Sequence, residues 1–104
     1  MPIPGYVWGA GHAAELAYLF PSFNNGTPIA PTFNAGERQL SRNMINYWGS
    51  FVFHADPNFQ GQASWPQFDP THEIMSLRVA GQSQAIGTAA FRAEHQCDLW
   101  DSLA

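Results

Sequence analysis

The sequence predicts a piece of an α/β domain, with about three helices and one late strand, that is not expected to fold on its own. Two observations come from patterning: one long segment repeats apolar residues at helical spacing, and one short segment alternates as a strand does. The third is composition. The 104 residues are 45% hydrophobic and only 12% charged, against about 25% charged in an ordinary soluble domain. A chain this short buries only about two-thirds of its unfolded surface, so some apolar surface needs a partner.

The first helix is predicted over residues 13–19, because Gly9 and Gly11 open a loop before it and Pro21 ends it. Residues 21–36 are rich in proline, glycine and asparagine and show no periodicity, which predicts a surface loop. This loop contains the glycosylation sequon at Asn25, which is usable only if the parent protein is secreted from a eukaryote.

The second helix is predicted over residues 37–53 and has a chemical signal at each end. Asn34 and Glu37 have the spacing of a capping box, and Asp56-Pro57 stops the helix after it. Its apolar stripe, expected to be buried, consists of Leu40, Met44, Trp48 and Phe51.

A single strand is predicted over residues 73–79, where apolar and polar residues alternate. A connection rich in glycine and glutamine then leads to a last helix over residues 88–103, with Cys97 and Trp100 on one buried face. A lone strand cannot complete its own hydrogen-bond ladder. Residues 1–104 are therefore interpreted as one segment of a larger domain.

Charge and cysteine content exclude several kinds of partner. The chain has four basic residues, all arginine, and a net charge of −4, so nucleic acid and anionic membrane are not expected partners. Glu15 interrupts the longest apolar stretch, so no membrane span is expected. Cys97 is the only cysteine, which excludes an internal disulfide framework and a structural zinc site. No targeting segment is predicted, although a longer parent is free to be secreted.

Three sequence features bear on cofactor, metal or nucleophile chemistry. Residues 9–14 (GAGHAA) fit a loose dinucleotide fingerprint but lack the flanking strands that it requires. His12 and Glu15 share a helical face without a third metal ligand. No Gly-x-Ser-x-Gly turn is present, and residues 81–85, the nearest imitation, are interpreted as a connecting turn. We therefore expect no cofactor and no metal, and interpret the remaining histidines as solvent-facing or capping residues: His54, His72 and His95.

Residues 9–20, which contain His12 and Glu15, resemble the catalytic-histidine segment of type-B carboxylesterases and cholinesterases. In that segment a histidine is followed three residues later by an acid and then by a short apolar stretch ending in Phe. Further motifs of the family follow in the same order and cover nearly the whole chain: Leu40-Ser41-Arg42-Asn43-Met44 with Tyr47-Trp48 and Phe51, Asp56-Pro57-Asn58, Trp65-Pro66-Gln67-Phe68, Met75-Ser76-Leu77, and Cys97-Asp98-Leu99-Trp100.

The resemblance implies the C-terminal portion of an α/β-hydrolase fold and the hydrolysis of small-molecule carboxylic esters. In such enzymes the triad runs serine, acid, histidine. His12 would be the general base, while the nucleophile, the triad acid and the oxyanion hole would lie in the upstream portion of the hydrolase. Ala13 stands where the family commonly has glycine. Cys97 matches a position that forms a disulfide in secreted cholinesterases, so it is either bridged or free, and the localisation stays open.

Two alternatives remain beside the esterase segment. One is a cholinesterase-like scaffold or binding protein that keeps the fold without catalysis. The other is a free-standing helical interaction module, which the unpaired strand disfavours. A companion polypeptide with a serine elbow and an acid would distinguish the esterase segment from these two alternatives.

Overall fold

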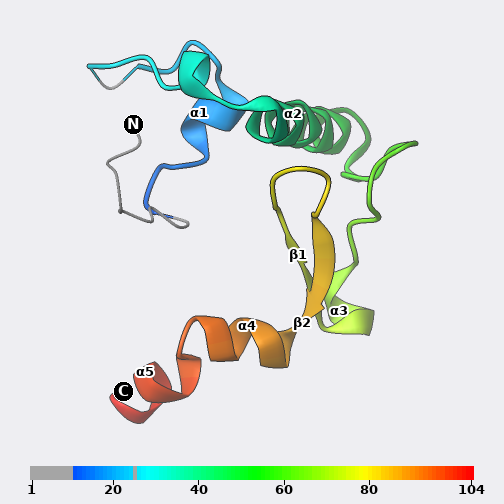
Figure 1. Ribbon diagram of the computed structural model, residues 1–104. Coiled ribbons are helices and arrows are strands. Elements are labelled where there is room, and N and C mark those ends of the chain that lie inside the picture. Colours follow the sequence, from blue (N-terminus) through cyan, green and yellow to red (C-terminus); the bar gives the residue numbers. More distant parts are fainter. Residues whose placement is uncertain (1–10, 25) are drawn as a thin grey trace.

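The computed structural model describes residues 11–24 and 26–104, and helices predominate among them. Figure 1 shows α1 and α2 together at one end, a hairpin in the middle, and α4 and α5 beside the C-terminus at the other end. The elements in chain order are α1 (Leu16–Leu19), the 3-10 turn η1 (Ala30–Thr32), α2 (Ala35–His54), α3 (Phe68–Thr71), β1 (Glu73–Ser76), β2 (Gln84–Gly87), α4 (Thr88–Glu94) and α5 (Cys97–Ser102).

Helix α2 confirms the predicted second helix and the chemical cause of its start. The Asn34 side chain accepts a hydrogen bond from the Glu37 N–H at 2.9 Å, and the Glu37 carboxylate accepts one from the Asn34 N–H at 2.7 Å. The two groups thus satisfy each other in a capping box. At the other end Ala55 takes a left-handed conformation with φ 59°, directly before Asp56-Pro57, which ends the helix.

Helix α1 is shorter than predicted, because its first expected turn is not α-helical. The prediction of residues 13–19 was wrong at its start: Ala13 has φ 63°, which is incompatible with a right-handed helix, so α1 begins at Leu16. The loop that follows holds η1 and one isolated bridge between Asn24 and Pro28. Asn25 and residues 1–10, including Gly9, lie outside the described residues.

The prediction of one unpaired strand was wrong. The expected strand ends at Ser76 instead of residue 79, and β1 pairs with β2 as an antiparallel hairpin whose register places Ile74 opposite Ile86. Left-handed Ala80 and Gly81, with φ 56° and 72°, reverse the chain between them. Segment β2 has only four residues and little apolar alternation, so it becomes a strand through pairing with β1.

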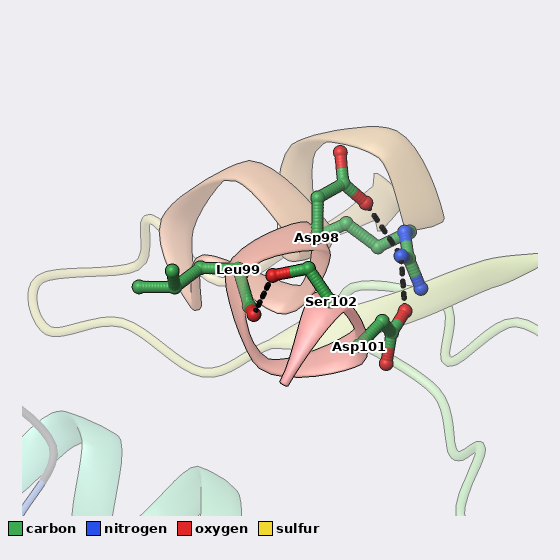
Figure 2. A network of polar contacts seen from close by, with 5 residues as sticks. Asp98, Leu99, Asp101 and Ser102 are labelled. Carbon is green, nitrogen blue, oxygen red and sulfur yellow. Dashed lines mark hydrogen bonds and ion pairs between the residues drawn. The ribbon is translucent and has the colours of Figure 1, made fainter. Parts of the chain in front are cut away.

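The predicted last helix is broken into α4 and α5. Gln96 has φ 51°, and this left-handed residue follows the C-cap of α4 and is the N-cap of α5. The Arg92 guanidinium donates hydrogen bonds to Asp101 at 2.6 Å and to Asp98 at 2.5 Å across the break, as Figure 2 shows. These bonds raise the pKa of Arg92, with Asp101 contributing most. Ion pairs this exposed add little stability.

The described residues do not form the buried face that was expected around Cys97. Cys97 is half-buried, and Trp100, its expected neighbour in the core, is 65% exposed. The expected stripe of α2 is likewise only half covered. Leu40 and Met44 are buried, whereas Trp48 is 41% exposed and Phe51 57% exposed. The periodicity predicts that Trp48 is buried, but the neighbouring Tyr47 is buried instead, at 1% exposed.

The chain has a large total surface and a large radius for its size. Its accessible surface is 7758 Å², whereas a compact monomer of this mass exposes about 5800 Å². Its radius of gyration is 15.6 Å, against about 13 Å for a compact domain of this length. The mixed helices and two-stranded sheet therefore have the character of a partial α/β fragment. In the part of the chain described, no helix combines the length and the apolar character that a membrane crossing requires.

Candidate active-site histidine

His12 lies on a hydrogen-bonded turn directly before α1. The Ala14 N–H donates to the Gly11 carbonyl at 3.1 Å, and the Leu16 N–H donates to the Ala13 carbonyl at 3.2 Å. The His12 side chain is exposed. An accessible imidazole on a turn tied to a helix can accept a proton from a group that another part of the protein brings to it.

Ala13 gives this turn its shape. A left-handed conformation costs a residue with a Cβ roughly 1–2 kcal/mol relative to the right-handed one. Ala13 adopts it with φ 63°, so the position favours glycine. This explains in physical terms why glycine is common at this place in the family that the sequence resembles.

Helix α1 is held against the N-terminal half of α2, where Figure 1 shows the two helices side by side. Ala17 is 2% exposed at this contact, and the Ser41 hydroxyl donates a hydrogen bond to the Tyr18 carbonyl at 2.6 Å. The Tyr18 ring stacks on Phe33 with the centroids 4.5 Å apart. Burial, with a smaller contribution from the Glu37 carboxylate, raises the pKa of Tyr18 above its ordinary value.

The sequence motifs do not single out Ser41, which is one residue of Leu40-Ser41-Arg42-Asn43-Met44. The available signal was its place between Leu40 and Met44 on the apolar face of the helix. A buried serine at such a place needs a hydrogen-bond partner.

The other histidines close helix ends and do not join His12. His54 is the last residue of α2, and His72 and His95 are the C-caps of α3 and α4. All three are exposed, which confirms the interpretation of solvent-facing or capping residues. Across residues 11–24 and 26–104, no three side chains of histidine, cysteine, aspartate or glutamate come together as a metal site would require.

Residues 81–83 lie in the hairpin connection, as expected, whereas Gln84 and Ala85 belong to β2, so the predicted turn is shorter than residues 81–85. Ser83 is used structurally: its hydroxyl donates to the Arg78 carbonyl at 3.1 Å and accepts from the Arg78 N–H at 2.9 Å. The Ser83 hydroxyl thus donates one hydrogen bond and accepts another within the turn. Of residues 9–14, which fit the dinucleotide fingerprint only loosely, the first two lie outside the described part of the chain.

The motifs Asp56-Pro57-Asn58 and Trp65-Pro66-Gln67-Phe68 contact each other through Asn58, beyond the C-terminal end of α2. The Asn58 carboxamide accepts from the Trp65 N–H at 2.6 Å and donates to the Trp65 carbonyl at 3.0 Å, in the manner of a paired strand. Ser50 secures the same loop by donating to the Asp56 and Asn58 carbonyls at 2.8 and 3.0 Å. These residues therefore hold the loop in place by hydrogen bonds.

An apolar groove of about 800 Å³ lies between this loop and α2. Tyr47 forms its floor, with edge-to-face contacts to Trp65 and Phe59 at centroid distances of 5.1 and 5.3 Å. The groove is open to solvent, and five of its eleven lining residues are aromatic: Tyr47, Trp48, Phe51, Ala55, Asp56, Pro57, Asn58, Trp65, Pro66, Gln67 and Phe68.

Comparison with known proteins places the chain in a family. The model of the carboxylesterase family matches residues 2–100. The chain is 35% identical over 91 residues to cocaine esterase of Homo sapiens, which covers 88% of this chain and 15% of that protein. It is 37% identical over 102 residues to the medium-chain fatty acyl-CoA hydrolase precursor of Anas platyrhynchos, with coverages of 97% and 16%.

A third relative, acylcarnitine hydrolase of Mus musculus, is 35% identical over 80 residues, which are 77% of this chain and 13% of that protein. The chain thus spans 13 to 16% of the length of these curated relatives. It corresponds to a fragment of such proteins, and the family match covers nearly all of it. By this match the chain belongs to the carboxylesterase family.

Proposed function

We propose that this chain contributes the catalytic histidine, His12, to a serine carboxylesterase that hydrolyses carboxylic esters through an acyl-enzyme. The observation that carries the proposal is an exposed imidazole on a hydrogen-bonded turn at the start of α1, in a chain that the carboxylesterase model matches over residues 2–100. Residues 1–104 would then form the C-terminal segment of an α/β-hydrolase domain.

His12 acts in this proposal as a general base and then as a general acid. A serine hydroxyl is a weak nucleophile at neutral pH, so one ring nitrogen of His12 takes its proton as the oxygen attacks the ester carbonyl. The same nitrogen returns the proton to the departing alkoxide, which leaves as the alcohol. Water then repeats the sequence on the acyl-serine and releases the acid.

The nucleophile, the triad acid and the oxyanion hole are assigned to the upstream portion of the hydrolase, on the same precursor or on a separate chain. The groove of about 800 Å³ and the exposed Trp48 and Phe51 beside it offer that portion an apolar surface. The edges of the two-stranded sheet offer it unpaired backbone groups.

The substrate class is a small-molecule acyl ester. The relatives are named for cocaine and acylcarnitine, which are esters, and for fatty acyl-CoA, which is a thioester. The groups that would select the acyl and alcohol parts are assigned to the upstream portion. No cofactor is needed for this chemistry, because the proton transfers and the acyl transfer use side chains alone.

The test is His12→Gln in the full-length carboxylesterase that contains this segment. Turnover should fall by roughly a thousandfold or more, because members of a triad act as a unit. Thermal unfolding should be nearly unchanged, since the His12 side chain is exposed. His95→Gln is the matched control, because His95 is also exposed but caps α4.

Retention of more than a tenth of the turnover by a folded His12→Gln enzyme would contradict the assignment. The cholinesterase-like scaffold without catalysis would then be the better account. A fall of equal size in the turnover of His95→Gln would show that the loss is not specific to His12 and would likewise contradict the assignment.

A further inference from the structure

Ser41 is the buried polar residue among the described core positions, at 8% exposed. It lies on the face of α2 that contacts α1, between the buried Leu40 and Met44. Its hydroxyl donates to the Tyr18 carbonyl at 2.6 Å, a bond between residues 23 positions apart in the chain. A buried serine is therefore used to join the two helices.

Helix α1 depends on this support because it is too short to be stable by itself. It spans only Leu16–Leu19, and isolated helices shorter than about 12 residues are marginal in water. The last four carbonyls of a helix have no partner inside it. The Tyr18 carbonyl is one of them, and among the described residues its donor is Ser41.

The position of α1 is passed on to His12 through consecutive backbone bonds. The Leu19 N–H donates to the Glu15 carbonyl at 3.1 Å, and the Leu16 N–H donates to the Ala13 carbonyl at 3.2 Å. The Ala14 N–H then donates to the Gly11 carbonyl at 3.1 Å, which spans His12 itself. No unbonded stretch separates Tyr18 from His12, so a shift of α1 moves the histidine.

We propose that Ser41 is a positioning residue for His12, which acts through the Tyr18 carbonyl and the backbone of α1. The inference rests on the proposed catalytic role of His12. Proton transfer needs the imidazole within hydrogen-bond reach of the serine. Loss of the Ser41 bond leaves the part-buried Tyr18 carbonyl without this donor and allows α1 to shift on α2.

The experiment compares kcat and KM of Ser41→Ala with those of the wild type in the full-length carboxylesterase. A displacement near 1 Å at the reacting groups costs on the order of a hundredfold in rate, so kcat should fall by tenfold to a hundredfold. KM should change by less than threefold, because Ser41 is buried where α2 contacts α1 and its hydroxyl bonds to the Tyr18 carbonyl. Ser41→Thr retains the hydroxyl and should restore most of the kcat.

Ser50→Ala is the matched control. Ser50 lies on the same helix and also donates to backbone carbonyls of a neighbouring loop, those of Asp56 and Asn58. The Ser50→Ala substitution removes the same hydroxyl group from the other end of α2, so the kcat of this variant should stay within twofold of the wild type. An equal fall in Ser50→Ala would overturn the proposal in favour of a general loss of stability.

Ser41→Cys covers the case in which Ser41→Ala does not fold. A thiol is nearly the same size but a weak donor, so kcat should lie clearly below the wild-type value in a folded enzyme. Wild-type kcat in a folded Ser41→Ala or Ser41→Cys enzyme overturns the positioning role.

The double variant His12→Gln with Ser41→Ala separates this inference from the proposed function. If Ser41 acts through His12, its substitution should lower kcat no further in the His12→Gln background. A full additional fall there overturns the positioning role while leaving His12 as the base. High activity of His12→Gln alone removes the proposed function instead.

Discussion

Tyr47→Ala should destabilise the full-length carboxylesterase more than any other single truncation within this segment. Tyr47 is the most deeply buried large side chain described, at 1% exposed. Its ring contacts Phe59 and Trp65 edge to face, and its hydroxyl donates to the Ala63 carbonyl. Tyr47 thus contacts three residues of the loop 56–68 and holds this loop against α2.

The magnitude follows from these contacts. Truncating a buried aromatic residue to alanine costs about 3–5 kcal/mol, from lost burial and the cavity that remains. Each aromatic pair adds about 0.5–1.5 kcal/mol beyond burial, so the loss at Tyr47 should lie at the upper end, about 5 kcal/mol. Tyr47→Phe keeps the ring and removes only the donor to Ala63, and should cost about 1–2 kcal/mol.

Trp48→Ala is the informative neighbour. Because Trp48 is 41% exposed in this segment, its loss approaches about 3–5 kcal/mol, the value for a buried large residue, only where the upstream portion covers it. The loss at Tyr47 arises inside the segment and needs no such cover.

The assay is denaturant unfolding, with midpoints compared at equal slope. A cost below about 1 kcal/mol for Tyr47→Ala, well under that of a buried aromatic truncation, would refute the reasoning, as would equal costs for Tyr47→Ala and Tyr47→Phe. Burial also raises the pKa of Tyr47 above its ordinary value. The stabilisation by the neutral phenol is therefore complete below about pH 10 and is lost as pH rises through the folded-state pKa. Tyr47→Phe should remove that part of the alkaline loss.

Three further outcomes are expected. The isolated chain should be inactive, should bind a dye that reports apolar surface and should unfold without a sharp transition; a cooperative transition with little dye binding would favour an autonomous module. Backbone and side-chain hydrogen bonds from Asn58 lower the pKa of Asp56, so their stabilisation is present above about pH 4 and is lost as pH falls through the folded-state pKa, and unfolding of Asp56→Asn should lack that acid dependence. Cys97, half-buried here, should react slowly with a thiol reagent in the native full-length enzyme and quickly after denaturation in reductant, whereas fast native labelling would place the face of α5 in solvent.

The sequence by itself determined the features that depend on neighbouring residues. Helix α2 has its boundary signals within a few positions of its ends, in Asn34, Glu37 and Asp56-Pro57, and its apolar period lies within one segment. Capping and periodicity act over one or two turns, so no distant residue is needed to predict them. The family assignment also came from short motifs in order, and the match over residues 2–100 confirms it.

Only the tertiary structure decided which residues meet across the chain. The pairing of β1 with β2 makes a strand of a segment whose own pattern is weak. Left-handed Ala13 shortens α1, and left-handed Gln96 divides the predicted last helix. Alanine and glutamine rarely adopt this conformation, so their types do not predict it. Tyr47 is buried and Trp48 is exposed because of the direction from which the loop approaches α2. Ser41 bonds to α1 because of the direction from which α1 approaches the same helix. Such contacts join residues far apart in sequence, and local propensity carries no information about them.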